Sequence, residues 1–435
     1  MSIKEIYQLY KQFPVVTTDS RNCPENSIFV ALKGENFNGN KFALSAIKSG
    51  CAYAIVDEAE YATDERIMLV EDCLQTLQQL ATYHRRQLNV TVIGITGSNG
   101  KTTTKELIAS VLSQQYNTLY TLGNFNNHIG VPLTLLRLTT EHEMAIIEMG
   151  ANHQHEIGIL AEIACPDYGI ITNIGKAHLE GFGSFENIIK TKGELYDYIR
   201  KINGKNFINL DNPILEKISI GLQKIGYSFK ISKKDTFVSG EITNHSSPTV
   251  EIAWEKENDN KKYEIKSNLI GVYNAENILA AVCIGAHFNV ESTKICQAIE
   301  NYVPENNRSQ LKKTERNTLI LDAYNANPTS MEMAIYNLYQ TNTDGKMKTV
   351  ILGDMFELGE DSQQEHQKVV NMLKGLHFEN VFLIGENFSA IETDYPSFFT
   401  VDDFLKTQQT NHINDAYILI KGSRGMKMER IIEYL

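Results

Sequence analysis

The sequence predicts a mixed α/β protein of three domains. Its 435 residues suffice for about three domains of roughly 150 residues each. Residues 90–115 combine an apolar strand, a glycine-containing loop and a helix, which is typical of parallel α/β sheets. Strand and helix patterns start afresh after Pro304. We therefore place the domains at residues 1–85, 86–304 and 305–435.

The first domain is predicted to be a small α/β unit. Residues 27–32 and 52–57 have strand patterns, and residues 41–50 have the pattern of a helix between them. Polar residues gather at positions 18–21, which include an Asp-Ser-Arg run, and in the loop 33–39. Such a run is a solvated turn as readily as a binding site. A further helix, over residues 73–87, leads into the second domain.

The second domain opens with a phosphate-binding loop. Gly97 and Gly100 let the backbone turn so that several N–H groups converge on an anion, and the following helix adds its positive end. Lys101 can then reach the terminal phosphates, and the Thr102 hydroxyl can bind Mg²⁺. The alternative is a glycine-rich turn without a ligand, because Ile95 stands where the general pattern has a glycine. We favour an ATP or GTP site.

Two further strands carry polar residues toward the same sheet edge. Residues 144–150 are apolar up to Glu148, and a carboxylate at the end of a parallel strand can hold Mg²⁺ beside the phosphates. Residues 168–173 predict another strand, and His178 follows it. Each side chain could instead be an ordinary cap or loop residue. Lys192, in a predicted helix over residues 185–200, would by its pattern alone lie on the surface.

The rest of the second domain has two predicted parts. Residues 205–270 alternate in short strands with polar turns, which predicts an antiparallel flap whose hairpin tip is 257–262. A helix follows, with Asn274 and Asn277 on one face. Asparagine is a poor helix former, so this pair suggests a hydrogen-bonding role.

The third domain is predicted to follow a linker at residues 304–307. It is of mostly parallel α/β type and has no second phosphate-binding loop. The predicted strands are 318–324, 348–354, 380–385 and 416–422, and the predicted helices are 329–340, 363–374 and 425–434.

Composition limits the classes of partner and the compartment. A net charge of −12 without a basic patch argues against nucleic-acid and membrane-surface partners. The N-terminus has no cleavage site, and no apolar run approaches the roughly 18–20 residues that cross a bilayer. The scattered cysteines indicate reduced thiols. We therefore expect a cytoplasmic protein, and a monomer. The cysteines are Cys23, Cys51, Cys73, Cys165, Cys283 and Cys296.

Six motifs together resemble the Mur ligase family over essentially the full length. They are Gly-Ser-Asn-Gly-Lys-Thr-Thr-Thr-Lys (97–105), Asn-Phe-Asn-Asn-His-Ile-Gly-Val-Pro (124–132), Glu-Met-Gly (148–150), Ala-His-Leu (177–179), Asp-Ala-Tyr-Asn-Ala-Asn-Pro (322–328) and Lys-Gly-Ser-Arg (421–424). The family's phosphate loop lacks the early glycine, which removes the misfit at Ile95.

The resemblance implies an architecture and an activity. The domains would be an N-terminal UDP-binding α/β domain, a central P-loop ATPase-like parallel sheet with an antiparallel flap, and a C-terminal Rossmann-like domain. ATP would convert a peptide carboxylate to an acyl phosphate, which an amine then attacks. The implied substrates are UDP-N-acetylmuramoyl-tripeptide and D-alanyl-D-alanine. The sequence leaves open whether the third peptide residue is diaminopimelate or lysine.

The resemblance also implies residue roles. Catalytic residues would be Lys101, His178 and Lys192. Thr102 and Glu148 would hold one Mg²⁺, and His178 a second, together with Lys192, which many family members carry as a carbamate. Nucleotide contacts would come from Gly97, Ser98, Asn99, Gly100, Lys101, Thr102, Thr103, Asn277, Arg308, Asp322, Tyr324 and Asn325. Substrate contacts would come from Ser20, Arg21, Lys33, Gly34, Asn126 and Asn327.

One departure and two rival interpretations remain. The first-domain loop has Asn-Gly-Asn-Lys at 38–41 where this kind of ligase often has Asp-Gly-His-Asp, so its sugar-nucleotide contacts are open. A related ligase that adds the third amino acid usually carries Asp-Asn-Pro-Arg in its third domain. Here Asp-Asn-Pro occurs at 211–213, in the central domain, before Ile214. A nucleotide-dependent switch would not need a UDP-sugar site.

Overall fold

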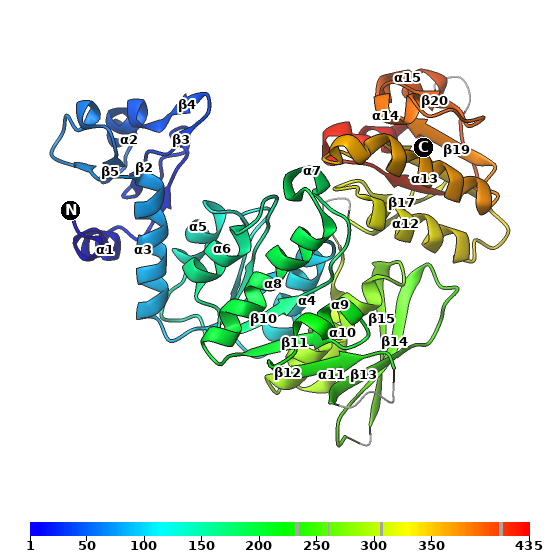
Figure 1. Cartoon of the computed structure of the whole chain (residues 1–435), viewed down its shortest axis with the longest axis horizontal. Coiled ribbons are helices and arrows are strands. Elements are labelled where there is room, and N and C mark those ends of the chain that lie inside the picture. The colour runs from blue at the N-terminus through cyan, green and yellow to red at the C-terminus, as the bar shows by residue number, and fades with distance from the viewer. Residues whose placement is uncertain (231–234, 260, 305–307, 409–411) are drawn as a thin grey trace.

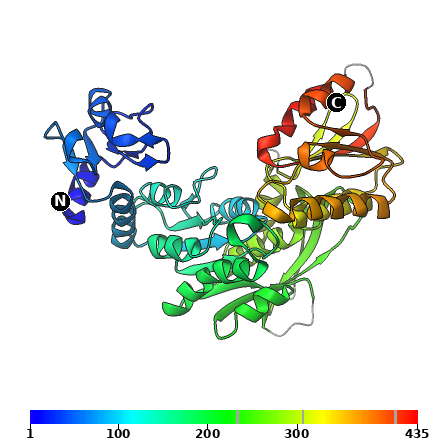
Figure 2. The same cartoon turned by 45° about the horizontal axis from the view of Figure 1, so that its top comes forward.

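The computed structural model describes residues 1–230, 235–259, 261–304, 308–408 and 412–435. Apart from a two-stranded hairpin, the strands in these residues form three sheets, of four, nine and six strands. Figures 1 and 2 show the first and third domains at opposite ends of the central one. This arrangement confirms the α/β prediction.

The first domain is a four-stranded parallel sheet with order β1-β2-β5-β6. The predicted helix over 73–87 is confirmed as α3, which begins where the Asp72 side chain accepts a hydrogen bond from the Gln75 N–H. The elements are α1 (Ile3–Gln12), β1 (Val16–Thr17), β2 (Ile28–Val30), β3 (Lys33–Gly34), β4 (Phe37–Asn38), α2 (Ala43–Lys48), β5 (Tyr53–Val56), β6 (Ile67–Leu69) and α3 (Cys73–Gln87).

The central domain is built on a nine-stranded sheet with order β15-β14-β13-β12-β11-β10-β7-β9-β8. Its elements are β7 (Thr91–Thr96), α4 (Lys101–Leu112), β8 (Thr118–Tyr120), α5 (Gly130–Leu135), β9 (Met144–Glu148), α6 (Glu156–Ala164), β10 (Tyr168–Ile171), α7 (Leu179–Phe182), α8 (Phe185–Lys201), β11 (Lys205–Asn209), α9 (Pro213–Ile218), β12 (Gln223–Ser228), β13 (Thr236–Ile242), β14 (Thr249–Lys256), β15 (Lys262–Ile270), α10 (Asn274–His287) and α11 (Ser292–Asn301).

The predicted flap is correct only for its second half. β13, β14 and β15 pair antiparallel, whereas β11 pairs parallel with β10, and β12 pairs parallel with β11. The prediction for residues 205–228 was wrong because a short helix, α9, makes a parallel crossover there. Asn212 begins this helix by accepting hydrogen bonds from two backbone N–H groups. Asn260, in the predicted hairpin tip, lies outside the described residues.

The third domain has a mostly parallel sheet of order β16-β17-β21-β18-β19-β20, with β16 antiparallel. The four predicted strands are confirmed. The predicted helix over 425–434 is instead two 3₁₀ segments, Arg424–Met426 and Met428–Tyr434, because Lys427 between them has a φ of 53°. The elements are β16 (Gln310–Lys313), β17 (Thr318–Asp322), α12 (Pro328–Gln340), β18 (Met347–Gly353), α13 (Ser362–Gly375), β19 (Asn380–Ile384), α14 (Glu386–Ser389), β20 (Ser397–Phe398), α15 (Val401–Gln408) and β21 (Ala416–Lys421).

Helix α3 connects the first domain to the central one. Its buried face, which includes Leu77, Leu80 and Ala81, belongs to one apolar cluster that runs from the first domain into the layer of α5, α6 and α8. A second cluster fills the opposite face of the central sheet under α4, α10 and α11. The proposed boundary at 85/86 therefore falls in the last turn of a helix that packs on both domains. The linker at 305–307 lies outside the described residues.

Candidate active site

The ends of three parallel strands bring the predicted site together. Ile95 of β7 pairs with Glu148 of β9, and Thr96 pairs with Ile171 of β10, so the loops after these strands start at one edge. A cleft of about 940 Å³ opens above this edge, between the central and third domains. Ligands bind at this edge in doubly wound sheets, so the prediction of a shared edge is confirmed.

Gly97 and Gly100 are required by the backbone of the phosphate loop. Their φ angles are 148° and 75°, which side chains rarely adopt. A Cβ at Gly97 would lie 2.0 Å from the Thr172 hydroxyl, and one at Gly100 would lie 2.7 Å from the Asn277 side-chain oxygen. The loop thus packs tightly on β10 and α10, and its N–H groups stay near the start of α4.

Lys101 folds back onto this loop. Its Nζ donates to the carbonyl oxygens of Gly97 at 2.7 Å and Ser98 at 3.2 Å. Burial lowers the pKa of Lys101, the positive charge of Arg308 lowers it further, and Glu148 opposes the shift. The negative charge of bound phosphate oxygens would stabilise the protonated form of Lys101.

Glu148 has the environment expected of a cation ligand. It is 1% exposed, and its Oε1 accepts hydrogen bonds from Thr102 Oγ1 at 3.2 Å and Asn126 Nδ2 at 2.8 Å. Its Oε2 is buried without a hydrogen-bond donor, and the nearest cationic partner in the described residues is Lys105 Nζ at 3.9 Å. A buried carboxylate oxygen left unpaired beside a threonine hydroxyl fits Mg²⁺, which commonly takes one or two carboxylates and substrate phosphates.

No described group of three or more His, Cys, Asp or Glu residues could hold a metal by itself. Any Mg²⁺ would therefore depend on nucleotide phosphates for part of its ligands. We expect Glu148→Gln to raise the Mg²⁺ concentration needed for half-maximal activity at least about tenfold, since each lost charged ligand costs over a kcal/mol. Titrating Mg²⁺ at saturating ATP measures this. The control is Glu186→Gln, which changes an exposed carboxylate on α8. If Glu148→Gln needed no more Mg²⁺ than the wild-type protein and this control, the assignment of Glu148 would be contradicted.

His178 faces the third domain. Its Nδ1 is hydrogen-bonded to the carboxylate of Glu357, and this hydrogen bond lowers the pKa of Glu357. Both residues have positive φ angles, 54° and 61°. The imidazole still lines the cleft, and with Nδ1 engaged its Nε2 is the nitrogen that remains for a cation.

Lys192 is buried, contrary to the prediction from its pattern alone. It is 2% exposed, and its Nζ lies 3.5 Å from the Ala151 carbonyl and 5.5 Å from the centre of the Phe182 ring. Burial holds the pKa of Lys192 well below its ordinary value, and the charge of Lys101 lowers it further. Burial thus favours the neutral amine, which is a nucleophile.

The predicted nucleotide residues surround the far side of the cleft. Asn277 accepts a hydrogen bond from Thr104 Oγ1 at 3.0 Å and donates to Asn274 at 2.7 Å, which confirms that the two asparagines share a face. Arg308 stacks 3.5 Å above the Tyr324 ring. Asp322 accepts a 2.6 Å hydrogen bond from the buried Lys421, which also donates to the Asn325 carbonyl.

Polar contacts attach the third domain to the phosphate loop. Asn327 donates to the Asn99 side chain at 2.7 Å and also caps α12. Nearby, the Lys176 N–H donates to Thr329 at 3.2 Å, and its Nζ lies 3.2 Å from Glu365. Asn327 thus has a structural role, whatever it contributes to substrate binding.

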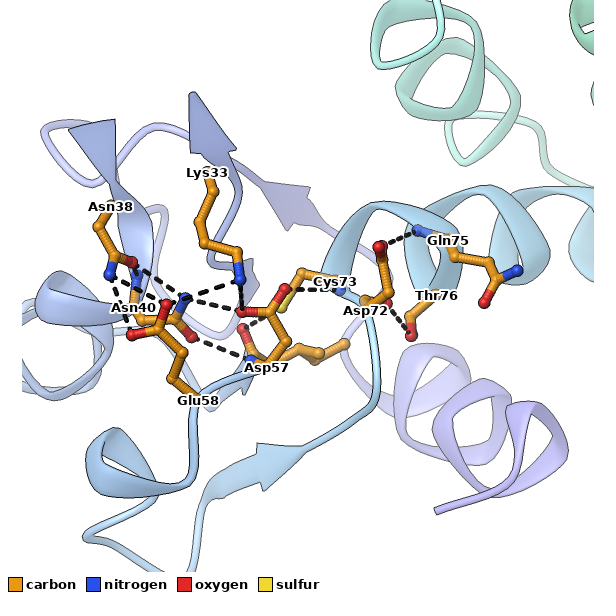
Figure 3. A network of polar contacts seen from close by, with 10 residues as sticks. Lys33, Asn38, Asn40, Asp57, Glu58, Asp72, Cys73, Gln75 and Thr76 are labelled. Atoms are coloured by element: carbon orange, nitrogen blue, oxygen red, sulfur yellow. Dashed lines mark hydrogen bonds and ion pairs between the residues drawn. The ribbon is translucent and has the colours of Figure 1, made fainter. Parts of the chain in front are cut away.

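The predicted sugar-nucleotide residues lie apart from the cleft. Arg21 is exposed and pairs with Asp19 at 2.9 Å. Figure 3 shows the loop around Lys33, whose Nζ lies 3.0 Å from Asp57 and 3.6 Å from Glu58. The buried Asn40, one of the departures in this loop, accepts from the Asp57 N–H at 2.9 Å and donates to its carboxylate at 2.8 Å. Asn40 therefore holds the loop to Asp57, the residue that follows β5.

Most of the predicted site residues line the one cleft: Ser98, Asn99, Gly100, Lys101, Thr102, Thr103, Asn126, Glu148, His178, Asn277, Arg308, Asp322, Tyr324 and Asn325. Those that do not line it are Ser20, Arg21, Lys33, Gly34, Gly97, Lys192 and Asn327. The prediction missed other residues of the cleft, among them His153, Glu156, Glu276 and Lys421. A signal existed for His153 and Glu156, because they follow the strand that carries Glu148.

A phosphate loop and a buried carboxylate beside it, in a cleft between two α/β domains, define a nucleotide-dependent α/β enzyme. Three family profiles match the chain: "Mur ligase family, catalytic domain" at residues 13–85, "Mur ligase middle domain" at 95–285, and "Mur ligase, glutamate ligase domain" at 307–431. The chain belongs to the Mur ligase family.

Relatives with nearly the same length support this. The UDP-N-acetylmuramoyl-tripeptide–D-alanyl-D-alanine ligases of Bacillus subtilis and Escherichia coli are each 34% identical, over 97% of this chain and 92% and 93% of theirs. Among solved structures, MurF from Acinetobacter baumannii has a TM-score of 0.86 at 31% identity, covering 98% of this chain and 97% of that one. MurF from Thermotoga maritima in complex with ADP has 0.84 at 26%, covering 97% and 96%.

Proposed function

We propose that this protein is an ATP-dependent ligase that joins D-alanyl-D-alanine to UDP-N-acetylmuramoyl-tripeptide. The product is the pentapeptide precursor of peptidoglycan, and ADP and phosphate are released. The observation that carries the proposal is the buried, half-satisfied Glu148 beside Lys101 and Thr102, in a cleft shared by two domains. Relatives that span nearly the whole chain and carry this activity in their names support it.

The chemistry needs activation and alignment more than a protein nucleophile. A carboxylate is inert to amines until one of its oxygens becomes a good leaving group, which phosphorylation by ATP provides. The phosphate-loop N–H groups and Lys101 bind and align the phosphates, and Thr102 and Glu148 would hold a cation. Bound Mg²⁺ would neutralise charge on the transferring phosphoryl group.

Lys192 fits a carbamate. Its amine is buried, and burial lowers its pKa, which favours the neutral form that reacts with CO₂. The Lys192 amine has a 3.5 Å contact to the Ala151 carbonyl. Carbamylation would turn this buried amine into an anion, which the nearby positive charge of Lys101 would stabilise. This anion would, with His178, complete a second cation site.

The rival ligase for the third amino acid is disfavoured by the role of the Asp-Asn-Pro run. Asp211 accepts hydrogen bonds from Ser228 Oγ at 2.8 Å and the Phe229 N–H at 2.6 Å, and Asn212 caps α9. These residues are occupied in local structure. They present no arginine to an amino-acid carboxylate.

Acceptor choice tests the proposal. D-alanyl-D-alanine should support ADP release and amide formation, whereas D-alanine, L-lysine and diaminopimelate should be at least about 10²-fold poorer, because contacts to the second residue are then lost. A coupled ADP-release assay with UDP-N-acetylmuramoyl-tripeptide, with and without each acceptor, measures this. Efficient turnover of diaminopimelate with the dipeptide substrate would move the assignment to the rival ligase.

Compartment and assembly follow from the same proposal. No helix in the described parts of the chain is both long and apolar enough to cross a membrane, and the six cysteines are free thiols. An enzyme that consumes ATP and a UDP-sugar works in the cytoplasm, where both occur. We further propose that the ligase acts as a monomer.

A further inference from the structure

The proposed ligation also requires a proton acceptor, and the following inference rests on that proposed function. The amino group of a dipeptide has a pKa near about 8, so much of it is ammonium at neutral pH. Only the free amine attacks an acyl phosphate. A positioned base typically speeds such a step by about 10²–10⁴-fold.

Six ionisable groups of the cleft already have at least one partner. Each has a hydrogen bond, an ion pair or a stacked ring among the described residues. They are Lys101, Glu148, His178, Arg308, Asp322 and Lys421. The other histidines and carboxylates that line the cleft, among the described residues, are His128, His153, Glu156 and Glu276. Of these, His153 and Glu156 pair with each other, in the loop that follows β9.

His153 and Glu156 form a histidine–carboxylate pair at the end of the loop between β9 and α6. The His153 Nδ1 lies 3.7 Å from Glu156 Oε1, and both residues line the cleft. The other carboxylate oxygen, Oε2, accepts the backbone N–H groups of Asn152 at 2.7 Å and His153 at 2.9 Å. Glu156 is thus fixed to the loop, and its charge favours a proton on Nδ1, which leaves Nε2 as the basic nitrogen.

The position of His153 suits a base near the reacting carbonyl. Its side chain is 70% exposed, so Nε2 can meet a substrate. The loop directly follows Glu148, and a Cβ at Gly181 would lie 3.6 Å from the His153 ring, so the ring is next to α7, the helix that His178 precedes. The 3.7 Å separation between His153 and Glu156 is no obstacle, since catalytic hydrogen bonds often form at full strength only when substrate binds.

We propose that His153 is the general base for the attacking amine and that Glu156 is its positioning residue. His153 Nε2 takes a proton from the bound ammonium, and the free amine forms the C–N bond. In the acyl phosphate, the bond between the acyl carbon and the bridging oxygen breaks, and its electron pair leaves with the phosphate. The amide nitrogen releases its second proton to solvent.

The test compares two acceptors with His153→Ala. Hydroxylamine is already unprotonated at neutral pH and traps an acyl phosphate as a hydroxamate without a base. We expect His153→Ala to lower amide formation with D-alanyl-D-alanine about 10²-fold or more while hydroxamate formation is unchanged. Added imidazole should restore part of the amide rate.

His155→Ala is the matched control. His155 is in the same loop and lies 3.4 Å from Glu194, but it does not line the cleft, so both rates should persist. Equal loss of both products in His153→Ala, or loss of neither, would overturn the inference. If the wild-type protein yields neither hydroxamate nor amide, the proposed function itself fails. Thermal unfolding of each variant shows that it has folded.

Discussion

Lys101→Ala is expected to lower turnover by about 10³-fold or more, because removing one preorganised charge from a transferring phosphoryl group costs several kcal/mol. The fold should remain, since among the described residues Lys101 Nζ donates to only two carbonyl oxygens, both in its own loop. Leaving those carbonyls without a donor costs about 1–3 kcal/mol at most. ADP release and thermal unfolding, measured on the same preparation, separate the two effects.

Lys101→Met is the control for packing, because it keeps the side-chain length and removes the charge. It should be as inactive as Lys101→Ala. A variant that regains activity with methionine, or a loss of folding as large as the loss of turnover, would show that the lysine acts through packing instead.

Lys192→Ala is expected to lower turnover by about 10²-fold or more, because the proposed carbamate, which would hold a cation, could then no longer form. Formate or acetate should then restore part of the activity by placing a free carboxylate in the vacated space. The measurement is ADP release as a function of added carboxylate. Isotopically labelled bicarbonate should also produce a carbamate signal in the wild-type protein.

Lys190→Ala is the matched control, an exposed lysine two positions earlier on α8. It should keep full activity and show no response to carboxylates. Two results together would contradict the proposed carbamate. The folded Lys192→Ala variant would not be rescued by carboxylates, and the wild-type protein would take up no labelled carbon. The phosphate-site assignments would be unaffected.

Local patterns were sufficient for most of the fold. β7, the phosphate loop and α4 follow one another within residues 90–115, so their spacing alone reports the site. The same holds for β9 and β10, whose apolar runs end at the shared edge. The pattern failed at residues 205–228, where α9 is too short for a helical period to emerge and its Asn-Pro start resembles a turn.

The resemblance to a family supplied what local patterns could not. Asp322 and Tyr324 have no sequence signal of their own that separates them from other polar residues, and the spacing of Asn274 and Asn277 indicated a hydrogen-bonding pair but no nucleotide contact. Their placement around the cleft agrees with the family's pattern. The first-domain residues were identified in the same way, and the structure adds that Lys33 is held by Asp57 and Glu58.

By itself, the sequence determined the α/β class, the phosphate loop and the acidic residue at the neighbouring strand end, because each depends on residues close together in the chain. Only the tertiary structure decided that Lys192 is buried and that His178 contacts Glu357 and Asp322 contacts Lys421. The partners in those two pairs are 179 and 99 positions apart. Desolvation and pairing of this kind arise from how sheets and domains pack, and no local period encodes them.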